Sequence, residues 1–284
     1  MAMGFVAAGG VAVAISAIRG LLHPAALDGA PSRRAGLRAM DLPLGLACMF
    51  MGGAAVGFLL QRLGFLGADM RPKVSGPAEY ALGIAIQCGT KGAAAGYFLF
   101  RAASFPGGLS QVGARPGWRD LYTAAVAIAV ALPVVFAVSA IGSVITGLLG
   151  HPTPKVGHET LKALIETDSH ASIALMVLSA AVVAPVLEEL VFRGLVQTTL
   201  LAAWGELQPL GRARAVVVFF ASLMFAAVHV GVAAPHALPA LFTLSLILGW
   251  VYERTGRLWP CVLIHAGFNL VNLTWALAMR NAGA

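Results

Sequence analysis

Charged residues are scarce in this sequence: they make up 11% of its 284 residues, whereas hydrophobic residues make up 59%. A soluble domain carries roughly 25% charged residues, and a chain this poor in polar groups cannot surround an apolar core with a polar surface. Cysteine is also scarce, and its three residues form no C-x-x-C pair, so neither a disulfide framework nor a cysteine metal site is indicated. Lipid tolerates apolar side chains all round a helix. The composition therefore predicts an integral membrane protein.

Long apolar runs indicate helices rather than a barrel, because they are continuous and do not alternate. A helix needs roughly 20 apolar residues to cross the hydrocarbon core. The sequence predicts an all-α, polytopic helical membrane protein with about eight transmembrane helices, residues 188–204 extending the fifth. Cys48, Cys88 and Cys261 fall singly within these spans and are expected to be small buried residues. The predicted spans are 2–18, 42–60, 78–100, 121–149, 171–187, 215–230, 237–252 and 258–279.

The basic residues lie between the predicted spans, so the net charge of +7 does not indicate a nucleic-acid partner. Cytoplasmic loops of membrane proteins are enriched in Lys and Arg. If the N-terminus lies outside, eleven basic residues fall inside and six outside, which places both termini outside and suits a bacterial-type inner membrane. The inner set is Arg19, Arg33, Arg34, Arg38, Arg101, Arg115, Arg119, Arg212, Arg214, Arg254 and Arg257. The outer set is Arg62, Arg71, Lys73, Lys155, Lys162 and Arg280.

The two halves of the chain differ in where their polar residues lie. Residues 1–150 contain N-terminal transmembrane helices without an identifiable motif, and Lys91, although it falls within a span, is assigned no role. Residues 150–170 form a polar connecting loop whose amphipathic stretch, 159–165, predicts a short interfacial helix. Farther along, polar residues recur inside apolar helices. They are costly in lipid, so they usually face a bundle interior or an aqueous cavity and carry function.

The first candidate cluster is EELVFR, from Glu188 to Arg193. Glu189 and Arg193 are four residues apart, so they share a helix face and can neutralise each other. Glu188 lies about 100° round the helix from Glu189 and is poorly placed to join that pair. Glu188 therefore has no charged partner on its own helix and can face another group, as a general base does. The alternative is that all three charges are solvated at the end of a span.

Two further clusters follow on later helices. Phe225 and His229 share a face in FAAVH, where a hydrogen-bonded packing histidine is the alternative. His265 and Asn269 share a face in HAGFN, and Asn272 continues the stripe. Paired donors there could hold an oxyanion, and an interhelical hydrogen bond is the alternative. Together the clusters supply a carboxylate, two imidazoles and an amide, a set that can activate water and stabilise a tetrahedral intermediate.

The series EExxxR, FxxxH and HxxxN on successive helices resembles the CPBP family of CAAX proteases and bacteriocin-processing enzymes, which includes the type II CAAX prenyl endopeptidases. The resemblance covers roughly residues 171–274, the predicted catalytic core, and includes TGRLWPCVLIH, from Thr255 to His265. It implies an intramembrane endopeptidase that hydrolyses a peptide bond of a membrane-associated protein or peptide in the lipid bilayer.

The same resemblance implies a role for each motif residue. The implied catalytic residues are Glu188, His229, His265 and Asn269, and the implied site-organising residues are Glu189, Arg193 and Phe225. By this resemblance Glu188 and His229 activate water, and His265 with Asn269 forms the oxyanion site. A competing mechanism uses a divalent metal such as zinc, for which Glu188, His229 and His265 are the candidate ligands.

Two other functions are compatible with a membrane protein of this composition. A non-catalytic scaffold or immunity-type member would keep the motif residues for packing alone. A transporter would use Glu188 and the histidines as a proton or cation path. The transporter is less favoured, because the polar residues gather in one half of the chain and no inverted repeat is visible.

Overall fold

The computed structural model describes residues 2–18, 23–31, 36–151, 156–204 and 210–282, and within these ranges the chain is helical, with isolated bridges but no strand. The predicted all-α fold is confirmed. The α-helices are α1 Ala2–Ile18, α2 Asp41–Arg62, α3 Pro77–Ala103, α4 Gly108–Gln111, α5 Trp118–Leu148, α6 Glu159–Glu166, α7 His170–Leu178, α8 Ala184–Glu189, α9 Thr198–Trp204, α10 Leu210–Ala227, α11 Leu238–Thr255 and α12 Leu258–Asn281. Two 3-10 segments, η1 Pro24–Leu27 and η4 Pro235–Ala237, and two π-helical segments, η2 Ser179–Val183 and η3 Leu190–Gln197, complete the set.

Five helical stretches of the described chain are long and apolar enough to cross a membrane. They are α2, α5, the continuous run His170–Trp204, the run Pro235–Thr255 and α12. The predicted extension of the fifth span to residue 204 is confirmed, but the count of about eight spans is not. Within the described residues α1 has 17 residues and is about 26 Å long at 1.5 Å per residue. Lys91 interrupts the apolar run of α3, and α10 carries Arg212 and Arg214 in its first turns.

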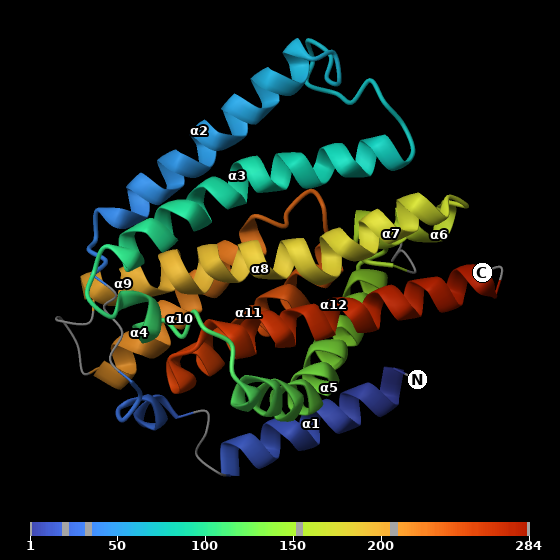
Figure 1. The fold of residues 1–284 in the computed structure, drawn as a ribbon. Helices are drawn as coiled ribbons and strands as arrows, with labels where there is room; N and C mark the ends of the chain where they lie inside the picture. The colour runs from blue at the N-terminus through green and yellow to red at the C-terminus, as the bar shows by residue number, and fades with distance from the viewer. Residues whose placement is uncertain (1, 19–22, 32–35, 152–155, 205–209, 283–284) are drawn as a thin grey trace.

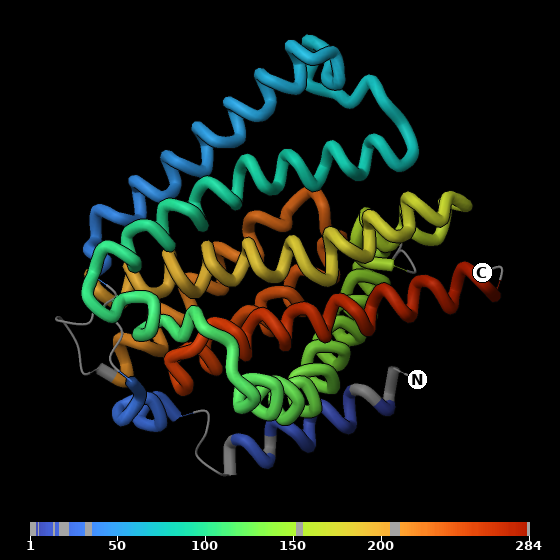
Figure 2. Tube along the Cα trace, viewed as in Figure 1, coloured from blue at the N-terminus to red at the C-terminus, as the bar shows by residue number. Residues whose placement is uncertain are grey.

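The stretch α7–α9 runs through the middle of the bundle. Figure 1 shows the hairpin of α2 and α3 on one side of it and α12 on the other, with α5 and then α1 beyond α12. The chain trace in Figure 2 places the start of α1 and the end of α12 toward the same end of the bundle. That both termini lie on the outer side of the membrane stays a prediction from the charge asymmetry.

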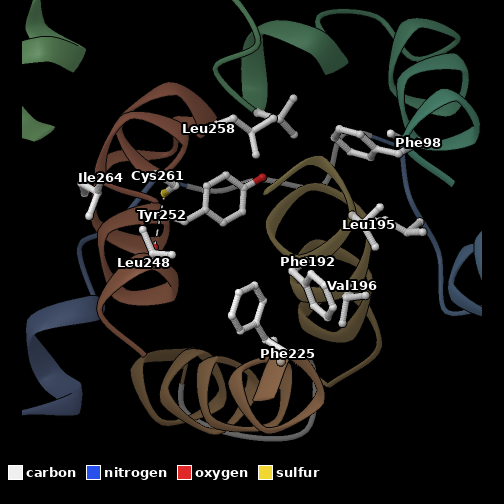
Figure 3. Packing of buried hydrophobic residues seen from close by; sticks show 14 of the residues in the cluster. Phe98, Phe192, Leu195, Val196, Phe225, Leu248, Tyr252, Leu258, Cys261 and Ile264 are labelled. Atoms are coloured by element: carbon white, nitrogen blue, oxygen red, sulfur yellow. Dashed lines mark hydrogen bonds between the residues drawn. The ribbon is translucent and has the colours of Figure 1, made fainter. Parts of the chain in front are cut away.

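The position of α3 is fixed on both of its faces by glycines. A Cβ atom on Gly52 of α2 would lie 2.2 Å from the carbonyl oxygen of Gly89 on α3, so the two helices touch backbone to backbone. On the other face, the ring of Phe98 fills the space beside Gly194 of η3, where a Cβ atom would lie 2.6 Å from it. Figure 3 shows Phe98 reaching the main core from α3. The hairpin is thus packed against the central helix.

The three cysteines are free, as predicted. The expectation that all three are buried is wrong for Cys88, which is exposed, whereas Cys48 is half-buried and Cys261 is buried. Cys88 lies on the outward face of α3, where an apolar thiol can face lipid.

The polar segment between α5 and α7 is a packed structure and not only a solvated connector. The predicted short helix is present as α6, and Leu164 on it is fully buried. Two backbone hydrogen bonds join this segment to the chain beyond α10: Ala234 N–H donates to the Gly157 carbonyl at 2.9 Å, and Glu159 N–H donates to the Val232 carbonyl at 3.1 Å. Together these segments form one layer at that end of the bundle.

Several of the basic residues predicted to be cytoplasmic gather at the opposite end. Arg254 donates to the Ala26 carbonyl at 2.8 Å, and Arg214 donates to the Pro31 carbonyl at 3.0 Å. At the same end Arg257 pairs with Asp120, which it contacts at 2.8 Å through Nη2. Arg19, Arg33, Arg34 and Lys155 lie outside the described residues. The orientation of this end toward the cytoplasm remains a prediction from the charge asymmetry.

Cysteine labelling from outside the cell should therefore distinguish the two ends. Positions Ser32 and Thr153 lie outside the described residues, but Gly29 and Glu159 are exposed neighbours. With the native cysteines replaced by alanine, we expect a membrane-impermeant maleimide to label Glu159→Cys in intact cells and Gly29→Cys only after permeabilisation. The reverse pattern would invert the assigned topology.

Candidate active site

The central helix changes geometry on both sides of the EELVFR motif. The π-helical segments η2 and η3 flank α8, which carries Glu188 and Glu189 as its last residues. Pro185 lies at the start of α8 and has no N–H, so it cannot donate to the carbonyl of Ala181 four residues earlier. Short π-helical segments inside α-helices occur frequently at functional sites. The apolar pattern predicted only a continuous helix here.

Glu188 is buried, with 5% of its side chain exposed. Its Oε1 accepts a hydrogen bond from Nζ of Lys91 on α3. Its Oε2 lies 3.9 Å from Nε2 of His229 and 4.0 Å from Nε2 of His265. These distances are too long for direct hydrogen bonds and short enough for one bridging water. One carboxylate oxygen is therefore held by a cation, and the other faces two imidazoles.

Glu189 joins two of the other motif residues. Its Oε2 lies 3.1 Å from Nε of Arg193, and both side chains are fully buried, so the pair predicted from the four-residue spacing is present. Its Oε1 lies 2.8 Å from Nδ1 of His265 on α12. Arg193 also donates from Nη2 to the hydroxyl of Ser245 on α11 at 2.9 Å and to its carbonyl at 3.0 Å. Glu189 and Arg193 thus tie three helices together.

His229 lies just beyond its helix and not near the end of it. The predicted span continued to residue 230, but α10 ends at Ala227 and His229 is in the following turn. Its Nδ1 is 2.7 Å from the Phe225 carbonyl oxygen, which can only accept, so Nδ1 carries a proton that it donates. In the neutral ring, Nε2 is then unprotonated. A basic nitrogen therefore faces Oε2 of Glu188.

Phe225 contacts both site histidines. Its ring centroid lies 4.7 Å from that of His229 and 5.8 Å, edge to face, from that of His265. The guanidinium carbon of Arg193 lies 5.3 Å from the same ring. Figure 3 shows the Phe225 ring beside Phe192, with which it makes a T-shaped contact at 5.1 Å. Phe225 is fully buried and forms an apolar wall for the site.

Asn269 lies one turn beyond His265 on α12. Its Nδ2 donates to the carbonyl of Ala180 in η2 at 2.7 Å, so it also contacts the wide turn of the central helix. The amide nitrogen has a second hydrogen that can be donated. Asn272, which continues the stripe in sequence, donates to the Phe268 carbonyl of its own helix at 2.9 Å.

Two residues near Glu188 were not anticipated from the sequence. Lys91 lies 97 positions earlier in the chain, and the available signal was only that a lysine inside an apolar run needs a partner. His158 precedes α6, and its Nδ1 accepts a hydrogen bond from the Thr160 N–H at 3.2 Å. Burial, reinforced by the nearby His229 ring, lowers the pKa of His158 below its usual value. His158 is therefore neutral at neutral pH.

The proposed metal ligands do not fit a metal site. Within the described ranges, no group of three or more His, Cys, Asp or Glu side chains is arranged to hold a metal ion. Oε1 of Glu188 already contacts the ammonium group of Lys91, and a cation at this position would repel a divalent ion. The metalloprotease alternative is therefore not supported by the geometry of Glu188, His229 and His265.

One protein family matches this part of the chain. Residues 170–271 match the family described as type II CAAX prenyl endopeptidase Rce1-like. No curated protein and no solved structure gives a match. The matched segment begins at the first residue of α7 and contains all three motifs, whereas α1 to α6 lie outside it. Residues 170–271 are therefore similar to the Rce1-like type II CAAX prenyl endopeptidase family, in agreement with the resemblance of the motifs.

Proposed function

We propose that this protein is an intramembrane endopeptidase that hydrolyses a peptide bond of a membrane-associated protein or peptide, in a bacterial-type inner membrane. The observation that carries the proposal is the position of Glu188 Oε2, at 3.9 and 4.0 Å from the Nε2 atoms of two histidines in a buried site. The match of residues 170–271 to a protease family supports protease activity. The helices long and apolar enough to span a bilayer support a membrane-bound substrate.

In the first step a water molecule between Glu188 and His229 attacks the substrate. Oε2 of Glu188 and Nε2 of His229 both accept hydrogen bonds, so the two hydrogens of one water can point at them. The carboxylate takes one proton, and the water oxygen forms a bond to the carbonyl carbon of the scissile peptide. General-base catalysis of this kind contributes about 10²–10⁴-fold in rate.

His265 and Asn269 then stabilise the negative oxygen of the tetrahedral intermediate. Asn269 has its second amide hydrogen to donate. His265 donates from Nε2 when its ring carries both protons, because Nδ1–H is directed at Glu189. Glu189, neutralised in turn by Arg193, orients this ring. Preorganised donors of this kind are commonly the largest single contribution to acyl-transfer catalysis.

Collapse of the intermediate completes the reaction. The carbonyl re-forms as the carbon–nitrogen bond breaks, and the proton held by Glu188 passes to the departing amine. The products are a new carboxylic acid and a new amino terminus, and Glu188 is again ionised. The acid then passes its proton to the amine, which gives a carboxylate and an ammonium group. Water is the only co-reactant.

Detection of new amino termini tests the proposed function without knowledge of the substrate. Purified protein in lipid nanodiscs would be incubated with detergent-solubilised membrane proteins from the same cells, and with a farnesylated peptide that ends in a CAAX sequence. We expect new termini with the unmodified protein and none with Glu188→Gln. If neither probe is cleaved in a Glu188-dependent way, the protein is better described as a non-catalytic scaffold.

Replacement of Asn269 by alanine should lower turnover far more than substrate binding. An oxyanion donor acts mainly in the transition state, so we expect kcat to fall about 10²-fold or more with little change in KM. Asn272→Ala is the matched control, because Asn272 is on the same helix and also donates to a backbone carbonyl, but that carbonyl is Phe268 of its own helix. A raised KM with unchanged kcat would instead assign Asn269 to substrate positioning.

A further inference from the structure

We infer that Lys91, on a helix outside the family-matched segment, is a positioning residue that holds Oε1 of Glu188 and so presents Oε2 to the two histidines. For its catalytic consequence this inference rests on the proposed function. It assigns the N-terminal half of the chain a part in the site. That half has no motif of its own.

The contact is of a kind that a buried carboxylate requires. Nζ of Lys91 bonds Oε1 of Glu188, and the exposed fractions of the two side chains are 30% and 5%. The lysine stem therefore reaches in from the surface of the bundle to a carboxylate that is shielded from solvent. A buried charge without a partner is strongly destabilising. Lys91 supplies that partner and fixes the rotation of the carboxylate.

The other charged or titratable groups around Glu188 make hydrogen bonds to other residues. They are His229 from the turn after α10, His265 from α12, His158 from the start of α6 and, on its own helical stretch, Glu189 with Arg193. Arg193 is bound by Glu189 and Ser245. His265 donates to Glu189, and His229 to a backbone carbonyl. The ammonium of Lys91 is in direct contact with Glu188, whereas the histidines lie 3.9 Å or more from it.

The placement of Lys91 follows from the packing of α3. Phe98, about two turns farther along α3, is fully buried against Gly194 of η3, and Figure 1 shows α3 running beside α8. Because both helices are rigid and closely packed, the lysine can reach Glu188 without moving the backbone. The packing of the α2–α3 hairpin therefore places the ammonium group of Lys91 against the carboxylate of Glu188 on another helix.

Carboxyl labelling tests the contact independently of any protease activity. Dicyclohexylcarbodiimide reacts with protonated carboxyl groups in apolar surroundings, and mass spectrometry locates the adduct. At pH 7 we expect little labelling of Glu188 in the unmodified protein and in Lys91→Arg, and roughly tenfold more in Lys91→Met, where the buried carboxylate has lost its cation. Gln87→Met is the matched control, because Gln87 lies one turn earlier on α3 and bonds Ser179 at 3.1 Å.

Cleavage by the same variants tests the catalytic consequence. We expect Lys91→Met to lower kcat by about 10²-fold with little change in KM. The acid limb of its pH–rate profile should move to higher pH, and Lys91→Arg should recover part of the lost rate. If Lys91→Met does not fold, Lys91→Gln, which keeps a donor but no charge, replaces it. Labelling of Glu188 that is equal in all variants, or cleavage by Lys91→Met at the unmodified rate, would overturn the inference. If the unmodified protein cleaves nothing, the proposed function fails, and the labelling result alone decides whether Lys91 keeps Glu188 ionised.

Discussion

Replacement of Glu188 by glutamine is expected to abolish cleavage while the protein remains folded. Glutamine has the shape of glutamate but cannot take a proton from water, so turnover should fall by at least about 10³-fold. Lys91 loses its charged partner, but its side chain is 30% exposed and can move its ammonium group toward the surface of the bundle. Turnover and thermal stability would be measured in the same detergent.

Glu79→Gln is the control for this variant, because it makes the same chemical change at an exposed position near the start of α3. We expect it to retain the unmodified rate and melting temperature. A Glu188→Gln protein that still cleaves at a near-normal rate would remove Glu188 from the mechanism. A Glu188→Gln protein that is both inactive and unfolded would assign Glu188 a structural role.

Replacement of Glu189 by glutamine is expected to reduce the yield of folded protein as well as activity. It leaves Arg193, which is 1% exposed, without its carboxylate partner, and loss of one partner of a buried ion pair costs about 3–5 kcal/mol. It also removes the charge that orients His265 through Nδ1. The fraction of monodisperse protein on gel filtration and the melting temperature measure this effect.

Arg193→Met should be milder than Glu189→Gln, because Glu189 then still has His265 as a hydrogen-bonded partner. The double variant Glu189→Gln/Arg193→Met removes both charges, so it should recover part of the stability lost in Glu189→Gln. Strictly additive losses in the double variant would show that the two charges are not coupled.

Contacts within one helix were predictable from the sequence because helix geometry fixes them. The four-residue spacing brought Glu189 to Arg193, and the apolar pattern predicted α6 and the long central helix. Phe225 also lies beside His229, although His229 is in the turn after α10. The number of spans was harder to predict, because a count of long apolar runs ignores charged residues that pair with one another inside the bundle. Arg214 and Glu253, from different helices, lie 3.5 Å apart in this way.

Contacts between helices could not be predicted from the spacing of residues along one helix. Lys91 meets Glu188 across 97 positions, and His265 meets Glu189 across 76. Both depend on how α3 and α12 pack against the central helix. The π-helical turns were also unpredictable, although Pro185 was visible, because a proline can equally kink or end a helix. These turns place the Ala180 carbonyl beside Asn269.

The central claim, that Glu188 activates water and does not itself attack the substrate, is tested most directly by a single turnover in H₂¹⁸O. With enzyme in excess over substrate, direct attack by water places one ¹⁸O atom in the new carboxylate of the product and none in Glu188. Mass spectrometry of the product and of the peptide that contains Glu188 reads out both positions. We predict label in the product alone. An unlabelled product in the first turnover, with ¹⁸O in Glu188, would show that the carboxylate is a nucleophile and would contradict this account.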